Sequence, residues 1–313
     1  MTTRRNFLKN TSLCALGGLF ATKAAGMQAA SFNTPAPMRT TAAKNIGLQI
    51  YSLGGELFAN VPVGLKKLKD MGYATIELAG YNPGKVGNVD MMEFKKMADD
   101  AGLVILSSHV NPPVHQYTKE NKGQIMEFWK QTADDHAKMG VTYLVQPGQP
   151  STRSLEETQY VCEVFNDAGK VVKEAGLPFG YHNHDFEFAK VVPGGTEAKF
   201  NRHGKGDAVY DVFLRETDPS LVFFEMDVFW TVMGQNDPVR YLKQYPDRIK
   251  LLHIKDSSVL GQSGMMNFET IFNQFYANGN KDYFVELEGM SNGTQFEGVK
   301  GCADYLLKSK FVK

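Results

Sequence analysis

The chain has 313 residues, and its 34 lysines and arginines balance 34 aspartates and glutamates, so the formal net charge is zero. This balance argues against nucleic acid as the main partner, because phosphate binding requires a surplus of Lys and Arg. Hydrophobic residues make up 42% of the chain and there are only three cysteines. That composition excludes a disordered chain and a disulfide scaffold, and it indicates a globular protein of one large domain or two small ones.

The N-terminus has the pattern of an export signal. Residues 1–30 begin with a pair of arginines followed by Phe-Leu-Lys, continue into a short apolar run and end in small residues. Such an arrangement predicts a secretory signal peptide, and the paired arginines resemble a twin-arginine signal. Residues 31–44 are rich in Thr, Ala and Pro and are predicted to be a linker, so the catalytic domain would be residues 45–313.

This signal predicts a location in the periplasm of a bacterium. Cys14 lies inside the apolar run and leaves a lipoprotein anchor as a weaker alternative. The run itself is short and interrupted, so we expect no membrane span once the signal has been cleaved.

From residue 46 onward, short apolar runs alternate with amphipathic segments. The runs predict strands at 46–52, 74–80, 103–110, 142–148, 178–184, 221–227, 249–256 and 283–289. The amphipathic segments predict helices at 63–71, 91–101, 125–139, 155–175, 208–216, 238–245, 268–277 and 296–307. A glycine follows several of these helices, as at Gly72 and Gly140, and glycine is a common residue at the end of a helix.

Strands that alternate with helices predict βαβ units and a parallel sheet. Eight such units in about 270 residues fit a (β/α)8 barrel, or TIM barrel, which typically has about 250 residues. An open doubly wound sheet is the competing fold. Residues 51–55, at the end of the first strand, read YSLGG and lack the glycine-rich turn of that fold, so we predict the closed barrel.

Polar residues are concentrated where the predicted strands end. Four of the seven histidines and several carboxylates lie there, namely His109, His182, His184, His253, Glu225, Asp227 and Glu286. The C-terminal ends of barrel strands meet at one mouth, where catalysis takes place. Imidazole and carboxylate groups that converge at this mouth would suit one divalent metal ion.

Each candidate also has a purely structural explanation. His253 would serve as a hydrogen-bonded core histidine, Asp227 as a helix N-cap and Glu286 as a partner in a salt bridge. Three further carboxylates have weaker claims, the first two as ordinary ion pairs at the mouth and the third as an exposed side chain: Glu77, Glu225 and Asp256.

Four segments together resemble the xylose isomerase-like barrel superfamily, the sugar phosphate isomerase/epimerase group. They are YHNHDFEF at 181–188, DVFW at 227–230, HIKD at 253–256 and FVE at 284–286, in this order along strands five to eight. The resemblance covers about residues 45–310. It implies a sugar-active enzyme with one divalent ion, held by one side chain from each of these strands. By position, the predicted ligands are His182, Asp227, His253 and Glu286.

The chain departs from the family pattern at strand five, where the family has a glutamate and this chain has His182. In the epimerases of the family, the glutamates of strands five and eight also move protons. This chain lacks the first of these two glutamates, so it cannot copy that symmetric mechanism. Two carboxylates in place of three leave more of the ion's charge to act on bound oxygen atoms. A set of two nitrogen and two oxygen ligands suits Mn²⁺, Zn²⁺, Co²⁺ or Fe²⁺ better than Mg²⁺.

The resemblance implies chemistry on a keto sugar through an enediolate. We expect His184 or Glu286 to act as the base and His109 to hydrogen-bond or protonate the sugar from the other side. Aromatic faces would contact sugar C–H groups, and a lysine would hold a hydroxyl. The predicted substrate-binding residues are Tyr51, Glu77, His109, Trp230 and Lys255.

Three classes of function follow. The first is a metal-dependent sugar isomerase or epimerase. The second is a lyase, dehydratase or hydrolase that acts on a 3-keto sugar or an inosose with the same metal site. The third is an exported carbohydrate-binding barrel without catalysis. In each case the partner is a small carbohydrate, and a homo-oligomer remains one option for the assembly.

Overall fold

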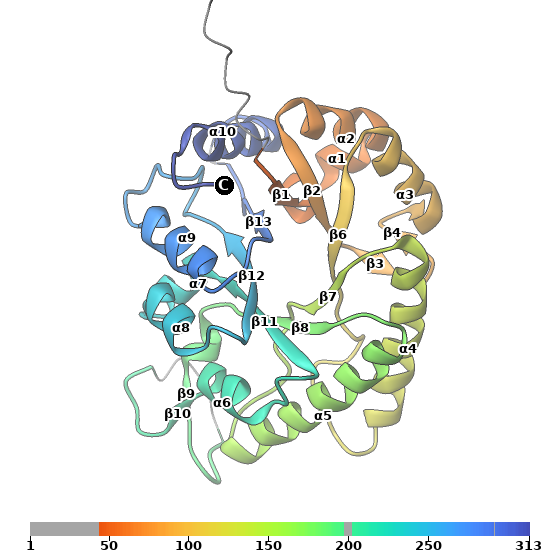
Figure 1. The fold of residues 1–313 in the computed structure, drawn as a ribbon. Coiled ribbons are helices and arrows are strands. Elements are labelled where there is room, and N and C mark those ends of the chain that lie inside the picture. Colours follow the sequence, from red (N-terminus) through yellow and green to blue (C-terminus); the bar gives the residue numbers. More distant parts are fainter. Residues whose placement is uncertain (1–43, 197–201, 291) are drawn as a thin grey trace, which may run out of the picture. The chain divides into compact units, whose positions relative to one another are not determined.

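The apolar runs of the sequence form eight strands that close into a barrel, with the helices around it (Figure 1). The computed structural model describes residues 44–196, 202–290 and 292–313. In order around the barrel, the strands are β1 (Ile46–Gln49), β2 (Tyr73–Leu78), β6 (Val104–His109), β7 (Tyr143–Gln146), β8 (Phe179–His182), β11 (Val222–Asp227), β12 (Ile249–Ile254) and β13 (Tyr283–Val285). All the barrel pairs are parallel, and β13 pairs back with β1. The predicted (β/α)8 barrel is confirmed.

Eight helices follow the barrel strands, close to the predicted ranges. They are α2 (Val61–Asp70), α3 (Met91–Asp100), α4 (Lys122–Met139), α5 (Leu155–Glu174), α6 (Val209–Glu216), α8 (Pro238–Gln244), α9 (Phe268–Ala277) and α10 (Gln295–Lys308). Side-chain caps define several of their starts. Asn60, Asp90 and Ser154, for example, each accept a hydrogen bond from a backbone N–H in the first turn, which satisfies a group that has no partner within the helix.

The sequence did not predict several short elements. Four of these are short helical elements that follow strands β1, β8 and β11: η1 (Ile50–Leu53), α1 (Gly55–Phe58), η2 (Phe186–Phe188) and α7 (Val228–Met233). Two small antiparallel sheets are formed by β3 (Tyr81–Asn82), β4 (Lys85–Val86) and β5 (Val89–Asp90), and by β9 (Lys190–Val191) with β10 (Asp207–Ala208). Segments of two to six residues are too short to show a hydrophobic period.

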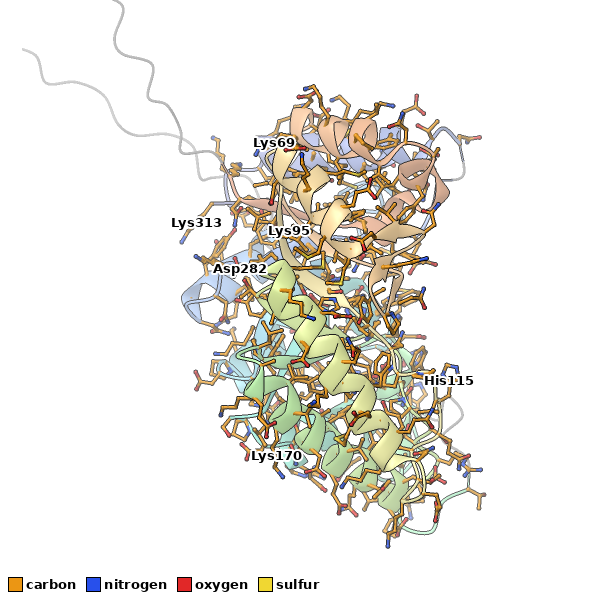
Figure 2. All side chains as sticks on the ribbon, turned by 90° about the vertical axis from the view of Figure 1, so that its right-hand side faces the viewer. Lys69, Lys95, His115, Lys170, Asp282 and Lys313 are labelled. Atoms are coloured by element: carbon orange, nitrogen blue, oxygen red, sulfur yellow. The ribbon has the colours of Figure 1, made fainter. Side chains whose placement is uncertain are left out.

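The barrel interior has an apolar floor. Val145, Phe223, Leu251 and Phe284 form a cluster separate from the larger core between strands and helices. The strands are buried on both faces, and all six residues of β11 are buried, because helices cover the outside while side chains fill the inside. Figure 2 shows His115, which follows β6 at the mouth, and Asp282, which precedes β13 at the bottom, on opposite sides of the molecule.

The predicted signal peptide, residues 1–30, lies outside the described residues, as does the predicted linker up to residue 43. Lys44, the last residue of that linker, is described, and its Nζ donates hydrogen bonds to the carbonyls of Leu306 (3.0 Å) and Leu307 (2.9 Å) in α10. Among the described residues, no helix is both long and apolar enough to span a bilayer.

Gly47 in β1 provides a test of how tightly the barrel is closed. A Cβ atom there would lie 2.4 Å from the carbonyl oxygen of Tyr283 and 2.8 Å from Oγ1 of Thr75. Since the backbone of β13 cannot move away without breaking its pairing, we expect Gly47→Ala to lower the free energy of unfolding by about 2–3 kcal/mol in urea denaturation. Gly123→Ala is the control, since a Cβ at this position in α4 meets nothing within 4 Å. Equal losses in the two variants would contradict the close packing.

Candidate active site

The site is built from side chains that alternate along the strands. Successive residues of a strand point to opposite faces, so every second residue of the later strands faces the barrel interior. These residues are Phe223, Glu225 and Asp227 from β11 and Leu251, His253 and Lys255 from β12 and the residue after it. The first of each set belongs to the apolar floor, and the next two are fully buried polar groups. Ionisable side chains therefore lie above an apolar floor. We call His182, Asp227, His253 and Glu286 the upper layer, and the groups that bond to its histidines or lie beside them, Glu77, His109 and Glu225, the lower layer.

The upper layer could hold a metal ion. His182, Asp227, His253 and Glu286 each offer one ligand atom, and these atoms all lie within 4.8 Å of one another. They come from four adjacent strands, and the pairing register places Asp227 beside His253. The structure therefore brings together the four side chains that the resemblance implied as ligands.

Two buried atoms of this layer have no hydrogen-bond partner in the described part of the chain: Nδ1 of His182 and Oδ2 of Asp227. Unsatisfied buried polar atoms are rare and costly, and a bound cation would satisfy them. Two imidazoles and two carboxylates are also a donor set that Zn²⁺, Mn²⁺, Fe²⁺ or Co²⁺ accepts. The residues present therefore fit a divalent ion.

Both explanations of Asp227 apply at once. Its Oδ1 accepts a hydrogen bond from the backbone N–H of Trp230 (2.8 Å) and so caps α7, while its Oδ2 has no hydrogen-bond partner within residues 44–196, 202–290 and 292–313. Burial raises the pKa of Asp227 to about 7, although the charge of Lys255 opposes this. The helix therefore fixes the carboxylate in place, and nearby positive charge favours its ionised form.

The lower layer supports the upper one. Nε2 of His253 lies 2.6 Å from Oε2 of Glu77, and Gln49 and Ser107 donate further hydrogen bonds to that carboxylate at 2.8 and 2.6 Å. Glu77 was predicted to bind substrate, but the structure places it below the pocket and fully buried. Its hydrogen bond holds the imidazole so that Nδ1 of His253 faces Glu286, 3.3 Å away.

Glu225, a weaker candidate in the sequence, lies at the centre of this lower layer. His109 Nε2 is 2.7 Å from its Oε2, and His109, His182, Glu225 and His253 form a second group whose ligand-type atoms lie within 4.8 Å of one another. Burial raises the pKa of Glu225, and the charge of Glu77 adds to this. Burial alone would also raise the pKa of Glu77, but the charges of His109 and His253 outweigh it and lower that pKa.

A pocket of about 320 Å³ opens above these layers. It is lined by Tyr51, Ala79, Gly80, His109, Asn111, Pro147, Gly148, His182, His184, Glu286 and Glu288. The predicted residues Tyr51, His109, His182, His184 and Glu286 thus face one space. Asn111 and Gly148 were not predicted, since no motif marks them; the Gly148 N–H donates to Oδ1 of Asn111 (2.7 Å) and joins the loops after β6 and β7.

Two of the predicted substrate-binding residues, Lys255 and Trp230, are not among the residues that line the pocket. Lys255 is fully buried, and its Nζ donates to Oε2 of Glu286 (3.0 Å) and to Glu288. The ammonium also lies 4.7 Å from the ring centroid of Trp230. The predicted contacts of Lys255 with a sugar hydroxyl and of Trp230 with sugar C–H groups stay predictions.

The pocket contains groups suited to accept and donate a proton. Burial lowers the pKa of His184 to about 4, so this imidazole is neutral near pH 7 and can accept a proton. Burial alone would lower the pKa of His109, but the charges of Glu77 and Glu225 raise it, which makes His109 a candidate proton donor. Burial alone would raise the pKa of Glu286, but its hydrogen bond to His253 and the charges of His253 and Lys255 hold it below its usual range.

Asp256 differs from its expected exposure, because the side chain is 2% exposed. Its two carboxylate oxygens accept hydrogen bonds from the backbone N–H groups of Ser257 (2.7 Å) and Gly261 (3.0 Å). The carboxylate closes the loop that follows β12, and this local bonding draws it inward.

Comparisons with known proteins agree with this architecture. A family profile described as "Xylose isomerase-like TIM barrel" matches residues 65–301. The crystal structure of a sugar phosphate isomerase/epimerase from Parabacteroides distasonis is 57% identical, with a TM-score of 0.82, and the match covers 86% of this chain and 100% of that one.

More distant relatives carry another name. An inosose dehydratase from Halalkalibacterium halodurans is 30% identical over 116 residues, and one from Bacillus anthracis is 26% identical over 196 residues. These matches cover 34% and 57% of this chain. They span 33% and 60% of the two relatives, less than two thirds of either.

The bond between Glu77 and His253 predicts a loss of metal affinity when the charge of Glu77 is removed. Glu77→Gln keeps the shape of the side chain, and its amide oxygen can still accept a hydrogen bond from His253. Because the amide carries no charge, this bond is weaker and holds the imidazole ring less firmly. We expect Zn²⁺ affinity, measured by competition with a chelator, to fall about 10- to 100-fold. The exposed Glu127→Gln should change nothing, and unchanged affinity in Glu77→Gln would remove the supporting role.

Glu187 predicts a pH dependence of stability. Its Oε2 accepts a hydrogen bond from the His184 N–H (2.9 Å) and its Oε1 from the Tyr181 hydroxyl (2.5 Å). Burial raises the pKa of Glu187 to about 8, so the folded protein keeps a proton that the unfolded chain has released. The stabilisation is complete below the pKa of the unfolded chain and is lost as the pH rises through about 8.

We therefore expect the wild-type protein to lose stability between about pH 5 and about pH 9 more steeply than Glu187→Gln, which has no such proton to lose. Urea unfolding at a series of pH values measures this difference. Parallel curves for the two proteins would show that Glu187 is ionised in the fold.

Proposed function

The chain belongs to the xylose isomerase-like TIM barrel family, and from that premise we propose that it is a divalent-metal-dependent sugar isomerase or epimerase acting on a keto sugar through an enediolate. The observation that carries the proposal is the group of His182, Asp227, His253 and Glu286, whose ligand-type atoms lie within 4.8 Å of one another. Two of its buried polar atoms have no hydrogen-bond partner among the residues that the structure describes, and His182 and Glu286 also line the pocket.

These four side chains would hold the ion, which when bound supplies a Lewis acid for a substrate carbonyl. The supporting carboxylates Glu77 and Glu225 orient and charge the histidines from below, as their bonds to His253 and His109 indicate. The protein thereby provides a preformed, buried charge distribution, which costs no rearrangement when the substrate reacts.

The proton steps are assigned to residues of the pocket wall. His184, with a lowered pKa, would take the proton from the carbon next to the carbonyl, and Glu286 is the alternative base. His109, with a raised pKa, would donate a proton to the sugar from its own side of the pocket. Return of the proton to the opposite face of the same carbon gives epimerisation, and return to the neighbouring carbon gives isomerisation.

Elimination is the second candidate. The strand-five position holds His182, whose pKa burial lowers with help from the charge of His253, so no second carboxylate acts from that side. An enediolate with a leaving group at the next carbon would then lose it, assisted by the proton of His109. Relatives named inosose dehydratase support this lyase or dehydratase alternative, and a carbohydrate-binding barrel without catalysis is the third class.

Export remains part of the proposal. The periplasmic location, the twin-arginine signal and the weaker lipoprotein alternative all depend on residues 1–30, and a homo-oligomer is likewise a prediction. A periplasmic protein would meet sugars from outside the cell.

Deuterium exchange tests the proposed chemistry. We expect Mn²⁺-loaded protein in D₂O to incorporate deuterium next to the carbonyl of a keto sugar with no loss of mass from the sugar, as followed by NMR and mass spectrometry. Exchange accompanied by loss of water or of an aglycone would instead identify the lyase. No exchange with any keto sugar, together with no bound metal, would contradict both and leave the binding barrel.

Two variants separate the base from the ligands in that experiment. His184→Ala should keep its metal and lose about 100-fold or more in exchange rate, because it removes only the base. His253→Ala should lose both metal and exchange. Full metal content in His253→Ala would show that the ion is not held by these residues.

A further inference from the structure

A buried ammonium group lies beside the candidate metal ligands. We infer that Lys255 competes with the ion for these ligands, so that its charge stabilises the metal-free protein and weakens metal binding. This inference rests on the metal site of the proposed function and deepens it, because it names a group that sets the affinity of that site for a cation.

Lys255 reaches two of the four candidate ligands. Its side chain is fully buried, its Nζ donates a hydrogen bond to Oε2 of Glu286 (3.0 Å), and Nζ lies 3.9 Å from Oδ2 of Asp227. Glu286 and Asp227 are the two carboxylates in the group of possible ligands. The ammonium therefore supplies positive charge to the same carboxylates that a divalent ion would use.

Asp227 has one oxygen left for an ion, and the ammonium approaches that oxygen. Its Oδ1 accepts from the backbone N–H of Trp230 (2.8 Å), whereas Oδ2 has no hydrogen-bond partner in the part of the chain that the structure covers. The 3.9 Å between Oδ2 and Nζ of Lys255 is too long for a hydrogen bond, but opposite charges at this distance attract strongly in a buried site. An ion bound to Oδ2 would therefore meet a like charge.

Other contacts let Lys255 keep its charge beside a bound ion. Its ammonium also donates to Glu288, which is not among the four candidate ligands and whose side chain is 46% exposed. Nζ also lies 4.7 Å from the ring centroid of Trp230, a favourable position for a cation. Lys255 therefore keeps two attractive contacts even where the ion uses Glu286.

These contacts give Lys255 two opposite effects. Without an ion, the ammonium is the partner of buried carboxylates, and a buried charge that loses its partner is strongly destabilising. With an ion, two cations share the charge of Glu286 and Asp227 and repel each other. If Lys255 instead served mainly to orient Glu286 for the ion, its removal would weaken metal binding, so the two roles predict affinity changes of opposite sign.

Lys255→Met, which replaces the ammonium by an unbranched apolar side chain of similar size, tests the inference in the full chain. We expect its Zn²⁺ affinity, measured by competition with a chelator, to rise about tenfold or more. After treatment with EDTA, urea should unfold the variant at a lower concentration than the wild type, and Zn²⁺ should stabilise the variant more. Lys250→Met is the control, since Lys250 is half-buried near the other end of β12, and it should not change the affinity.

Weaker or unchanged Zn²⁺ affinity in Lys255→Met would overturn the competition, and equal stability of the two metal-free proteins would overturn the stabilising role. If the variant folds only with Zn²⁺, the ion has replaced the lost charge, and the release of zinc to excess EDTA should be about tenfold slower than from the wild type. A variant that does not fold even with Zn²⁺ would contradict the inference. Failure of the wild type to bind Zn²⁺ would end the proposed metal site itself, which separates that failure from the others.

Discussion

Buried carboxylates inside a closed barrel are the constraint on which this site depends. Glu77, Glu225 and Asp227 are each fully buried, and a buried charge without a partner is strongly destabilising. Positive charge must therefore accompany them. In the lower layer it comes from His109, whose pKa is raised by the charges of Glu77 and Glu225 despite burial. In the upper layer, Lys255 supplies part of it, and a metal ion would supply the rest.

The two layers divide the work of the site. The carboxylates of the lower layer, Glu77 and Glu225, bond to His253 and His109 and hold these imidazoles in one orientation. The upper layer keeps unsatisfied atoms on His182 and Asp227 and borders the pocket, so it is the layer with capacity to bind a ligand.

The candidate ligands could be predicted because their positions follow from local patterns. A strand that ends in His253 or in Asp227 places that residue at the mouth of any parallel barrel, and the alternation along each strand points these side chains inward. Glu225, the weaker candidate, lies two residues before Asp227 and points inward by the same period. By contrast, α7 and the small sheets gave no signal, since elements of two to six residues are shorter than the patterns that reveal them.

By itself, the sequence determined the order of strands and helices, the closed barrel and the residues that reach its mouth, because hydrophobic periodicity is a property of neighbouring positions. Only the tertiary structure decided which charges meet. The bond from His253 to Glu77 joins residues 176 positions apart, and the burial of Lys255 depends on carboxylates after another strand. Such contacts depend on the register between strands, which spacing along one strand does not encode.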